Sequence, residues 1–219
     1  QGVITVANEF GGPAYVQDTT AGISVYDSTV SQNVNRGDKV VLLGVVSPYQ
    51  NMFELNPCSL LQVISQGNSV DTTTLTIASI KGQNQNGVEP YECRLIRVSN
   101  ITSVITSAKS PATTWGTTGV ASTLYLISGT DTLQTYIKAN NSLCNTSAPS
   151  EKFDMVGVLG QYYTNYQILP RTYSDIIVEG AGPRIISGVP YESNITSSSI
   201  TFTWQTDLPG SSIVIRGLT

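Results

Sequence analysis

The chain has 219 residues, a formal net charge of −4 and only 12% charged residues, and it contains no histidine. This length can hold one large or two small domains with their own cores, and the singly scattered lysines and arginines form no basic stripe that could follow a phosphate backbone. The lack of histidine excludes the usual nucleophile and general-base pairs, and no paired carboxylates stand out. We therefore predict no enzyme activity and no cofactor or metal, and the charge argues against nucleic acid as a partner.

The residue types favour an all-β fold. Thr, Val, Ile and Tyr are common, and long runs of helix-forming residues are scarce. No apolar run approaches the length of a transmembrane helix, so we predict no membrane span. Low charge with many Ser, Thr, Asn and Gly residues is typical of secreted and cell-surface proteins. The strand-like opening "GVITV" after Gln1 suits a mature N-terminus left by signal cleavage, so we expect an extracellular or cell-surface protein.

The first part of the chain predicts five strands. One strand covers residues 3–7, a hairpin begins at Ala14 and turns at residues 18–22, and a second hairpin lies within residues 37–57. Residues 77–81 are expected to form a short helix, followed by the loop "GQNQNG". A strand at residues 94–99 and a hairpin from Thr123 come next. Trp115 lies in a long loop, and we expect it to pack against the core because an exposed Trp is costly without a partner.

An internal repeat relates two of these hairpins. "GDKVVLLGVVSPYQNMFELNP", residues 37–57, aligns without a gap with "SEKFDMVGVLGQYYTNYQILP", residues 150–170, at an offset of 113. Each copy is a strand ending in Gly-Val, a Tyr near a turn, and then an aromatic–polar–aliphatic–x–Pro phrase. Including the strands upstream, each repeat has five strands in the order strand, hairpin, hairpin, which suits a small closed barrel.

The first repeat resembles a known kind of module. Its phrases Y-x-Q-D-x-x-x-G-I-x-V-Y, G-D-K-V-x-x-x-G-x-V and E-L-x-P are similar to the tandem OB-fold-like modules of bacterial secreted and surface proteins, which often accompany extracellular nucleases and phosphoesterases, and "EPYECRLIRVSNI" opens the second module in the same way. The resemblance implies two OB-like five-stranded barrels, at residues 1–68 and 69–179, the latter including a linker. It implies an accessory role, and it transfers no catalytic residue.

The C-terminal residues 180–219 resemble the first strands of a fibronectin type III-like, immunoglobulin-like sandwich. In "SSSITFTWQTDLPGSSIVIRGLT" apolar residues alternate with polar ones, and Trp204 matches the buried Trp of that family. Such a sandwich needs about seven strands and roughly 100 residues. The chain is then either part of a longer protein or a sandwich half that another subunit completes by strand addition. Five residues are the expected assembly contacts: Ile200, Phe202, Trp204, Ile213 and Ile215.

The three cysteines, Cys58, Cys93 and Cys144, match no zinc motif. They are disulfide candidates, since three cysteines allow one bridge in three pairings, or a bridge between subunits. Buried unpaired thiols are the alternative for at least one of them.

Two functions from different classes fit these observations. The first is a non-catalytic structural protein that assembles with copies of itself into a filament, sheath or surface layer through its C-terminal β segment. The alternative is an accessory carbohydrate- or nucleic-acid-binding region of a larger secreted hydrolase, because OB barrels can bind such ligands on aromatic platforms. The candidate binding residues are Tyr15, Tyr26, Tyr49, Phe53, Tyr162 and Tyr166. Packing of these side chains in the barrels or between them is the competing explanation.

Overall fold

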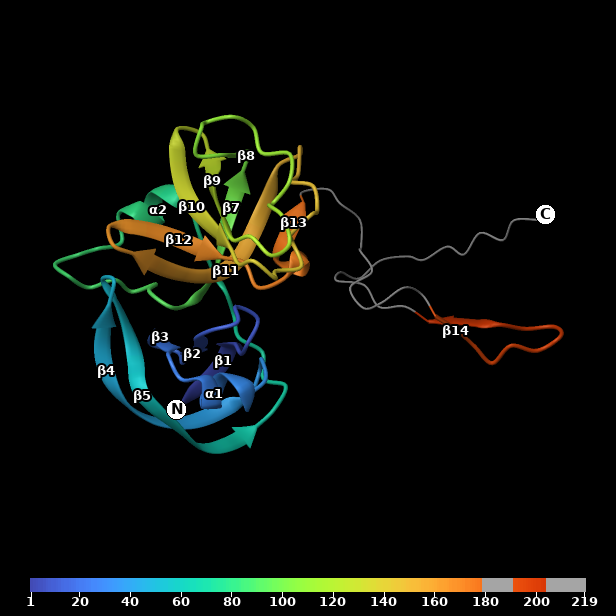
Figure 1. The fold of residues 1–219 in the computed structure, drawn as a ribbon, viewed down its shortest axis with the longest axis horizontal. Helices are drawn as coiled ribbons and strands as arrows, with labels where there is room; N and C mark the ends of the chain where they lie inside the picture. Colours follow the sequence, from blue (N-terminus) through green and yellow to red (C-terminus); the bar gives the residue numbers. More distant parts are fainter. Residues whose placement is uncertain (179–190, 204–219) are drawn as a thin grey trace. The chain divides into compact units, whose positions relative to one another are not determined.

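The computed structural model describes residues 1–178 and 191–203 (Figure 1). The prediction of a mostly β chain is confirmed, with short helices between strands. The chain divides into two compact units, residues 1–178 and 179–219, which are described separately below.

The first part of unit 1 is a closed barrel with the strand order β1-β2-β3-β5-β4. Neighbouring strands are antiparallel except β3 and β5, which are parallel through Ser24–Glu54 and Val25–Leu55. A short helix between β3 and β4, α1 (Ser28–Gln32), begins where the Asp27 carboxylate accepts hydrogen bonds from the Thr29 and Val30 amides. The strands are β1 (Gly2–Val6), β2 (Ala14–Gln17), β3 (Gly22–Val25), β4 (Lys39–Tyr49) and β5 (Met52–Ser65).

A second sheet follows, with the order β6-β7-β11-β12-β10-β9-β8 and with β13 paired to β11. The helix predicted at residues 77–81 is confirmed as α2 (Ile77–Lys81). It is started by a capping box between Thr76 and Ser79. A 3₁₀ turn, η1 (Tyr173–Asp175), precedes the last strand of the sheet. The strands are β6 (Thr73–Leu75), β7 (Leu95–Ile101), β8 (Ser103–Ile105), β9 (Ser122–Ser128), β10 (Asp131–Ile137), β11 (Phe153–Tyr162), β12 (Asn165–Leu169) and β13 (Ile176–Val178).

The strand pairing repeats at the offset of 113 found in the sequence. Leu55 of β5 pairs in parallel with Val25, and its equivalent Ile168 of β12 pairs in parallel with Thr135 of β10. The two hairpins also end alike, because Tyr49 opposite Met52 becomes Tyr162 opposite Asn165. The two halves of unit 1 therefore share their connections as well as their sequence pattern.

Each half has its own apolar core, and Trp115 belongs to the second. Its side chain is fully buried and meets the Phe153 ring edge-on at 6.0 Å between centroids. The expectation that Trp115 packs against the core is confirmed. The core of the first half contains Ile4, Val16, Val25, Val30 and Val40.

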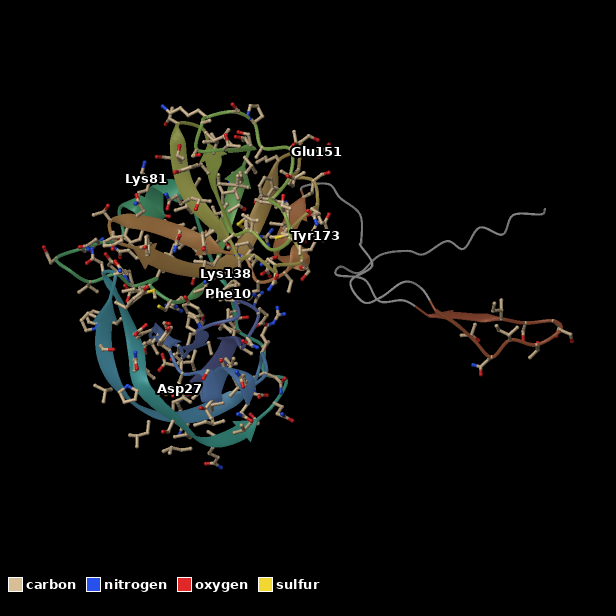
Figure 2. The ribbon with its side chains drawn as sticks, viewed as in Figure 1. Phe10, Asp27, Lys81, Lys138, Glu151 and Tyr173 are labelled. Atoms are coloured by element: carbon tan, nitrogen blue, oxygen red, sulfur yellow. The ribbon has the colours of Figure 1, made fainter. Side chains whose placement is uncertain are left out.

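A third cluster joins the two halves. It contains Phe10 and Tyr15 from the first half and Leu95 and Val158 from the second. The Gln17 side chain reaches across and accepts a 2.7 Å hydrogen bond from the Leu95 amide. Lys138 also crosses this contact, with its ammonium 5.9 Å from the centre of the Phe10 ring (Figure 2).

The three cysteines are free, buried thiols, which corresponds to the alternative of unpaired cysteines rather than to a disulfide. Cys58 lies in the core of the first half, Cys144 in that of the second and Cys93 in the cluster between them. Burial raises the pKa of the Cys93 thiol well above its usual value.

In unit 2 the structure describes one antiparallel pair, β14 (Tyr191–Ser193) and β15 (Thr201–Thr203). Tyr191 lies opposite Thr203 and Ser193 opposite Thr201. Among residues 191–203 no third strand joins this pair.

Candidate interaction surfaces

The β4–β5 ribbon, residues 39–65, exposes many large apolar side chains. Lys39 and Glu54 are its only charged residues, and Glu54 is buried. Large apolar side chains exposed in this number on two paired strands are typical of interaction sites when they lie together. The exposed large apolar side chains of the ribbon are Leu43, Val45, Val46, Tyr49, Phe53, Leu61, Val63 and Ile64.

One edge of this ribbon is mostly unpaired within residues 1–178 and 191–203. On the side away from β5, β4 pairs with β1 only at Lys39 and Val40. Within the described residues no strand pairs with that side of β4 beyond Val40. A long apolar strand edge with free backbone donors and acceptors can accept another strand, and this one lacks the charges that usually protect such an edge.

The equivalent edge in the second half is covered. There β7 runs antiparallel along β11, from Ile101 opposite Phe153 to Leu95 opposite Val158. Two further hydrogen bonds extend the pairing, from the Cys93 amide to the Leu159 carbonyl and from the Leu159 amide to the Arg94 carbonyl. β1 corresponds to the end of β7 together with β8, because Gly2 opposite Val40 matches Ile101 opposite Phe153, and β1 and β8 each pair with the first strand of the following hairpin. The part of β7 that continues along β11, residues 95–98, has no counterpart in the first barrel among the described residues.

The tips of the two repeated hairpins meet. The Tyr163 amide donates to the Gln50 carbonyl at 3.0 Å, and the Asn51 side-chain amide donates to the Tyr163 carbonyl at 2.9 Å. Tyr162 and Tyr163 contact each other edge-on at 4.8 Å between ring centroids. With Tyr49, these rings give an exposed aromatic group at the junction of the halves.

The candidate binding residues are not all on this surface. Tyr26, Tyr49, Phe53 and Tyr162 are exposed, but Tyr15 is only 4% exposed, and it lies in the cluster between the halves with its pKa raised by burial. Tyr15 is therefore part of the packing and does not contribute to an exposed platform.

Tyr166 is half-buried, and its hydroxyl donates to a Glu89 carboxylate oxygen at 2.7 Å. Burial and the Glu89 carboxylate raise its pKa to about 12. Phe53 is held nearby through its amide, which donates to Glu92 Oε1 at 3.1 Å. Burial, opposed by this hydrogen bond, raises the pKa of Glu92.

Of the expected assembly residues, Ile200 is exposed just before β15, and Phe202 lies in β15. Trp204, Ile213 and Ile215 lie outside the described residues. All eight residues from 194 to 201, between and beside the two paired strands, are exposed.

Across residues 1–178 and 191–203, no group of three or more acidic, cysteine or histidine side chains is placed to hold a metal ion. No helix in that part of the chain is long and apolar enough to cross a membrane. No protein-family model matches the chain, and no curated protein matches its sequence.

Sequence reasoning missed the free β4 edge. The signal was present as an uncharged run, "VVLLGVVSPYQ", in residues 40–50. Such a run predicts a strand buried on both faces. Whether a strand lies beside it depends on a distant part of the chain, which the local pattern does not contain.

Proposed function

We propose that this chain is a non-catalytic structural subunit that assembles with copies of itself outside the cell through its C-terminal β segment. The observation that carries the proposal is the β14–β15 pair, which no third strand joins among residues 191–203. A two-stranded sheet is at best marginally stable in water and needs further strands or a packed face. Here the exposed Ile200 begins an alternating apolar series that continues in the sequence at Phe202 and Trp204. Docking of this segment on another copy of the chain would supply further strands and cover its apolar side chains.

The same proposal includes the finer fold. A five-stranded barrel with the order β1-β2-β3-β5-β4, a parallel β3–β5 pair and a helix before β4 is consistent with the OB type. The second half is consistent with it too when β7 and β8 are taken as one bent strand. We propose two OB-like modules, at residues 1–68 and 69–179, followed by a partial fibronectin III-like segment at residues 180–219. In such a chain the barrels are rigid bodies, and association between copies takes place at strand edges.

Sedimentation velocity and negative-stain electron microscopy of the 219-residue chain test the assembly. We expect filaments or rings that grow with concentration. Ile200→Asp should abolish them, because it places a charge in the contact, whereas Ile195→Asp, at an exposed position between the two strands, should leave them intact. A chain that stays monomeric at every concentration would rule the proposal out, as would equal assembly of both variants.

Glycan binding is a second candidate, favoured by the aromatic group at the hairpin tips. Exposed rings from both halves lie beside amide groups of Gln50 and Asn51, and ligand sites combine apolar surface with a few polar groups in this way. Titration calorimetry with soluble oligosaccharides is the test. Tyr163→Ala should remove binding and Tyr173→Ala, on η1, should not. If neither variant differs from the unmodified chain, the tip is not the site.

A further inference from the structure

The two halves of unit 1 serve as internal references for each other, and three positions near the free β4 edge differ in burial. Val46 is 59% exposed, while its equivalent Leu159 is 1% exposed. The other two positions are half-buried in the first half and fully buried in the second. The three equivalent pairs are Val46 and Leu159, Leu42 and Met155, and Leu55 and Ile168. Because the paired strands are otherwise alike, we attribute the difference to residues 95–98 of β7, which have no counterpart in the first half among the described residues.

A cavity of about 310 Å³ lies in the same region of the first barrel. It is bounded by the start of β1 and by the two half-buried leucines of β4 and β5. Its mainly apolar lining suits a branched aliphatic side chain entering from a strand beside β4. Its lining includes Gln1, Gly2, Val16, Ile23, Leu42 and Leu55, and four residues at the β2–β3 turn complete it: Gln17, Asp18, Ala21 and Gly22. The free edge and the cavity together form a strand-acceptor site.

We propose that this acceptor site binds residues 212–218 from the C-terminal segment of a second copy of the chain, as a strand antiparallel to β4. The proposal rests on the self-assembly proposed above and identifies its acceptor surface. Donor and acceptor are different surfaces, so the contact is head-to-tail and propagates into rings or filaments. Backbone hydrogen bonds supply affinity, and alternate side chains supply specificity.

The donor is identified by its likeness to β7. "LIRV" at residues 95–98 of β7 corresponds to "VIRG" at residues 214–217. In the second half Ile96 lies opposite Gly157, and Arg97 lies opposite Val156. Transferred by the repeat offset, Ile215 lies opposite Gly44 with its side chain in the cavity. The glycine is needed at both places, because a Cβ would come within 2.8 Å of a carbonyl oxygen of the neighbouring strand.

The same register predicts which residue of β4 lies next to a charged side chain of the bound strand, and charge substitutions can test this. Arg97 forms an ion pair with Asp154, 2.7 Å from Nη2 to Oδ2, and the equivalent of Asp154 in the first half is Val41. In the proposed contact Arg216 of the second copy takes the place of Arg97. Val41→Asp should therefore strengthen assembly and Val41→Lys should weaken it, each by about two- to fivefold in the concentration needed for assembly. With Arg216→Glu in the same chain, the order of the two variants should reverse.

This reversal separates a direct contact from a structural role of Val41. If position 41 matters only for the stability of the barrel, Arg216→Glu cannot invert the ranking of the two variants. Unfolding midpoints of all four chains, measured in urea, show whether either substitution at position 41 damages the fold. An unchanged ranking in folded chains overturns the proposed register and donor.

A graft tests the acceptor site directly. Adding the sequence of residues 94–99, Arg-Leu-Ile-Arg-Val-Ser, ahead of Gln1 places a copy of β7 in line with β1, in the register seen in the second half, because Gly2 opposite Val40 matches Ile101 opposite Phe153. This strand should occupy the site within its own chain. The grafted chain should then remain monomeric, whereas a chain with a six-residue Gly-Ser extension should assemble like the unmodified one. Assembly of the grafted chain would overturn the acceptor assignment and leave the C-terminal assembly standing.

Failure of the underlying assembly gives a different result. If the unmodified chain never assembles, the proposed function fails, and the acceptor site is tested by fluorescence anisotropy with a labelled peptide of residues 211–219. Binding to the unmodified chain but not to the grafted chain supports the site and its ligand. Equal binding to both, or none, overturns the inference. A monomer in which disulfide trapping joins residue 215 to β4 of its own chain overturns the choice of a second copy.

Discussion

Replacing Trp115 with Ala tests the best-defined core of the molecule. Its indole is fully buried in the core of the second half and meets the Phe153 ring edge-on. Removing a buried Trp side chain costs about 3–5 kcal/mol. One feature lowers this figure, because indole Nε1 is buried without a hydrogen-bond partner and already costs about 1–3 kcal/mol in the folded state. We therefore expect Trp115→Ala to lose about 3 kcal/mol.

A second substitution separates the two contributions. Trp115→Phe keeps an aromatic ring against Phe153 and removes the unpartnered N–H, so a smaller loss, below about 2 kcal/mol, is expected. Val120→Ala is the matched control, since Val120 is 61% exposed at the end of the same loop and should change stability by less than about 0.5 kcal/mol.

Urea unfolding followed by far-UV circular dichroism measures all three, because the Trp115 variants lose the fluorescent side chain itself. For a domain of this size 1 kcal/mol corresponds to about 2–4 °C in Tm, so Trp115→Ala should melt about 6–12 °C lower. A loss below 1 kcal/mol for Trp115→Ala would refute the reasoning, because it would mean that burial of the indole contributes little to the free energy of unfolding. A greater loss for Phe than for Ala would refute the part assigned to Nε1.

Three further predictions concern polar groups. Gln17→Ala should lose about 1–3 kcal/mol in urea unfolding, because it leaves the buried Leu95 amide without its acceptor between the halves. Burial raises the pKa of Glu92, so its stabilising contribution is present at acid pH and is lost as pH rises through its pKa in the folded state. Glu92→Gln should therefore be more stable than the unmodified chain at pH 7, by up to about 1 kcal/mol in urea unfolding. This gain in stability should vanish at acid pH. Hydrogen bonds from the hydroxyl and amide of Thr20 and from the Ala21 amide lower the pKa of Asp18 to about 2. The stability that Asp18 contributes is therefore full above pH 3.8 and is lost as pH falls through about 2. The difference in unfolding free energy between Asp18→Asn and the unmodified chain should shrink over this pH range, and it should stay below about 1 kcal/mol because Asp18 is exposed.

Local patterns predicted the hairpins and the short helix. Alternating residues with turn formers between them fix each hairpin, and Thr76 with Ser79 caps the helix at residues 77–81. The repeat offset of 113 correctly identified Leu55 and Ile168 as equivalent positions, because each of them pairs in parallel with a strand of the preceding hairpin. Such features depend on neighbours close in sequence.

The candidate sites depended on contacts that no local pattern holds. Tyr15 and Tyr26 belong to the same hairpin phrase, yet Tyr15 is buried in the cluster that joins the two halves, while Tyr26 is exposed. Tyr49 and Tyr163 come together because two hairpin tips over 100 residues apart share hydrogen bonds. Sequence could propose aromatic platforms on each half, but it could not show that the exposed rings meet at one junction.

The difference in burial between equivalent positions of the two repeats shows why the β4–β5 ribbon is exposed. If exposure of Val46 arose from its own sequence, its equivalent Leu159 would be exposed as well, since both follow a glycine–valine pair in matching strands. Leu159 is buried because Cys93 and Arg94 pair with its backbone. Burial at this position is therefore a property of the strand beside it. An apolar edge that is uncharged over ten residues, next to a cavity bounded by half-buried leucines, has the character of an interior surface. At this edge the first half differs from the second by the strand segment that lies beside it, and the acceptor experiments ask which segment supplies it.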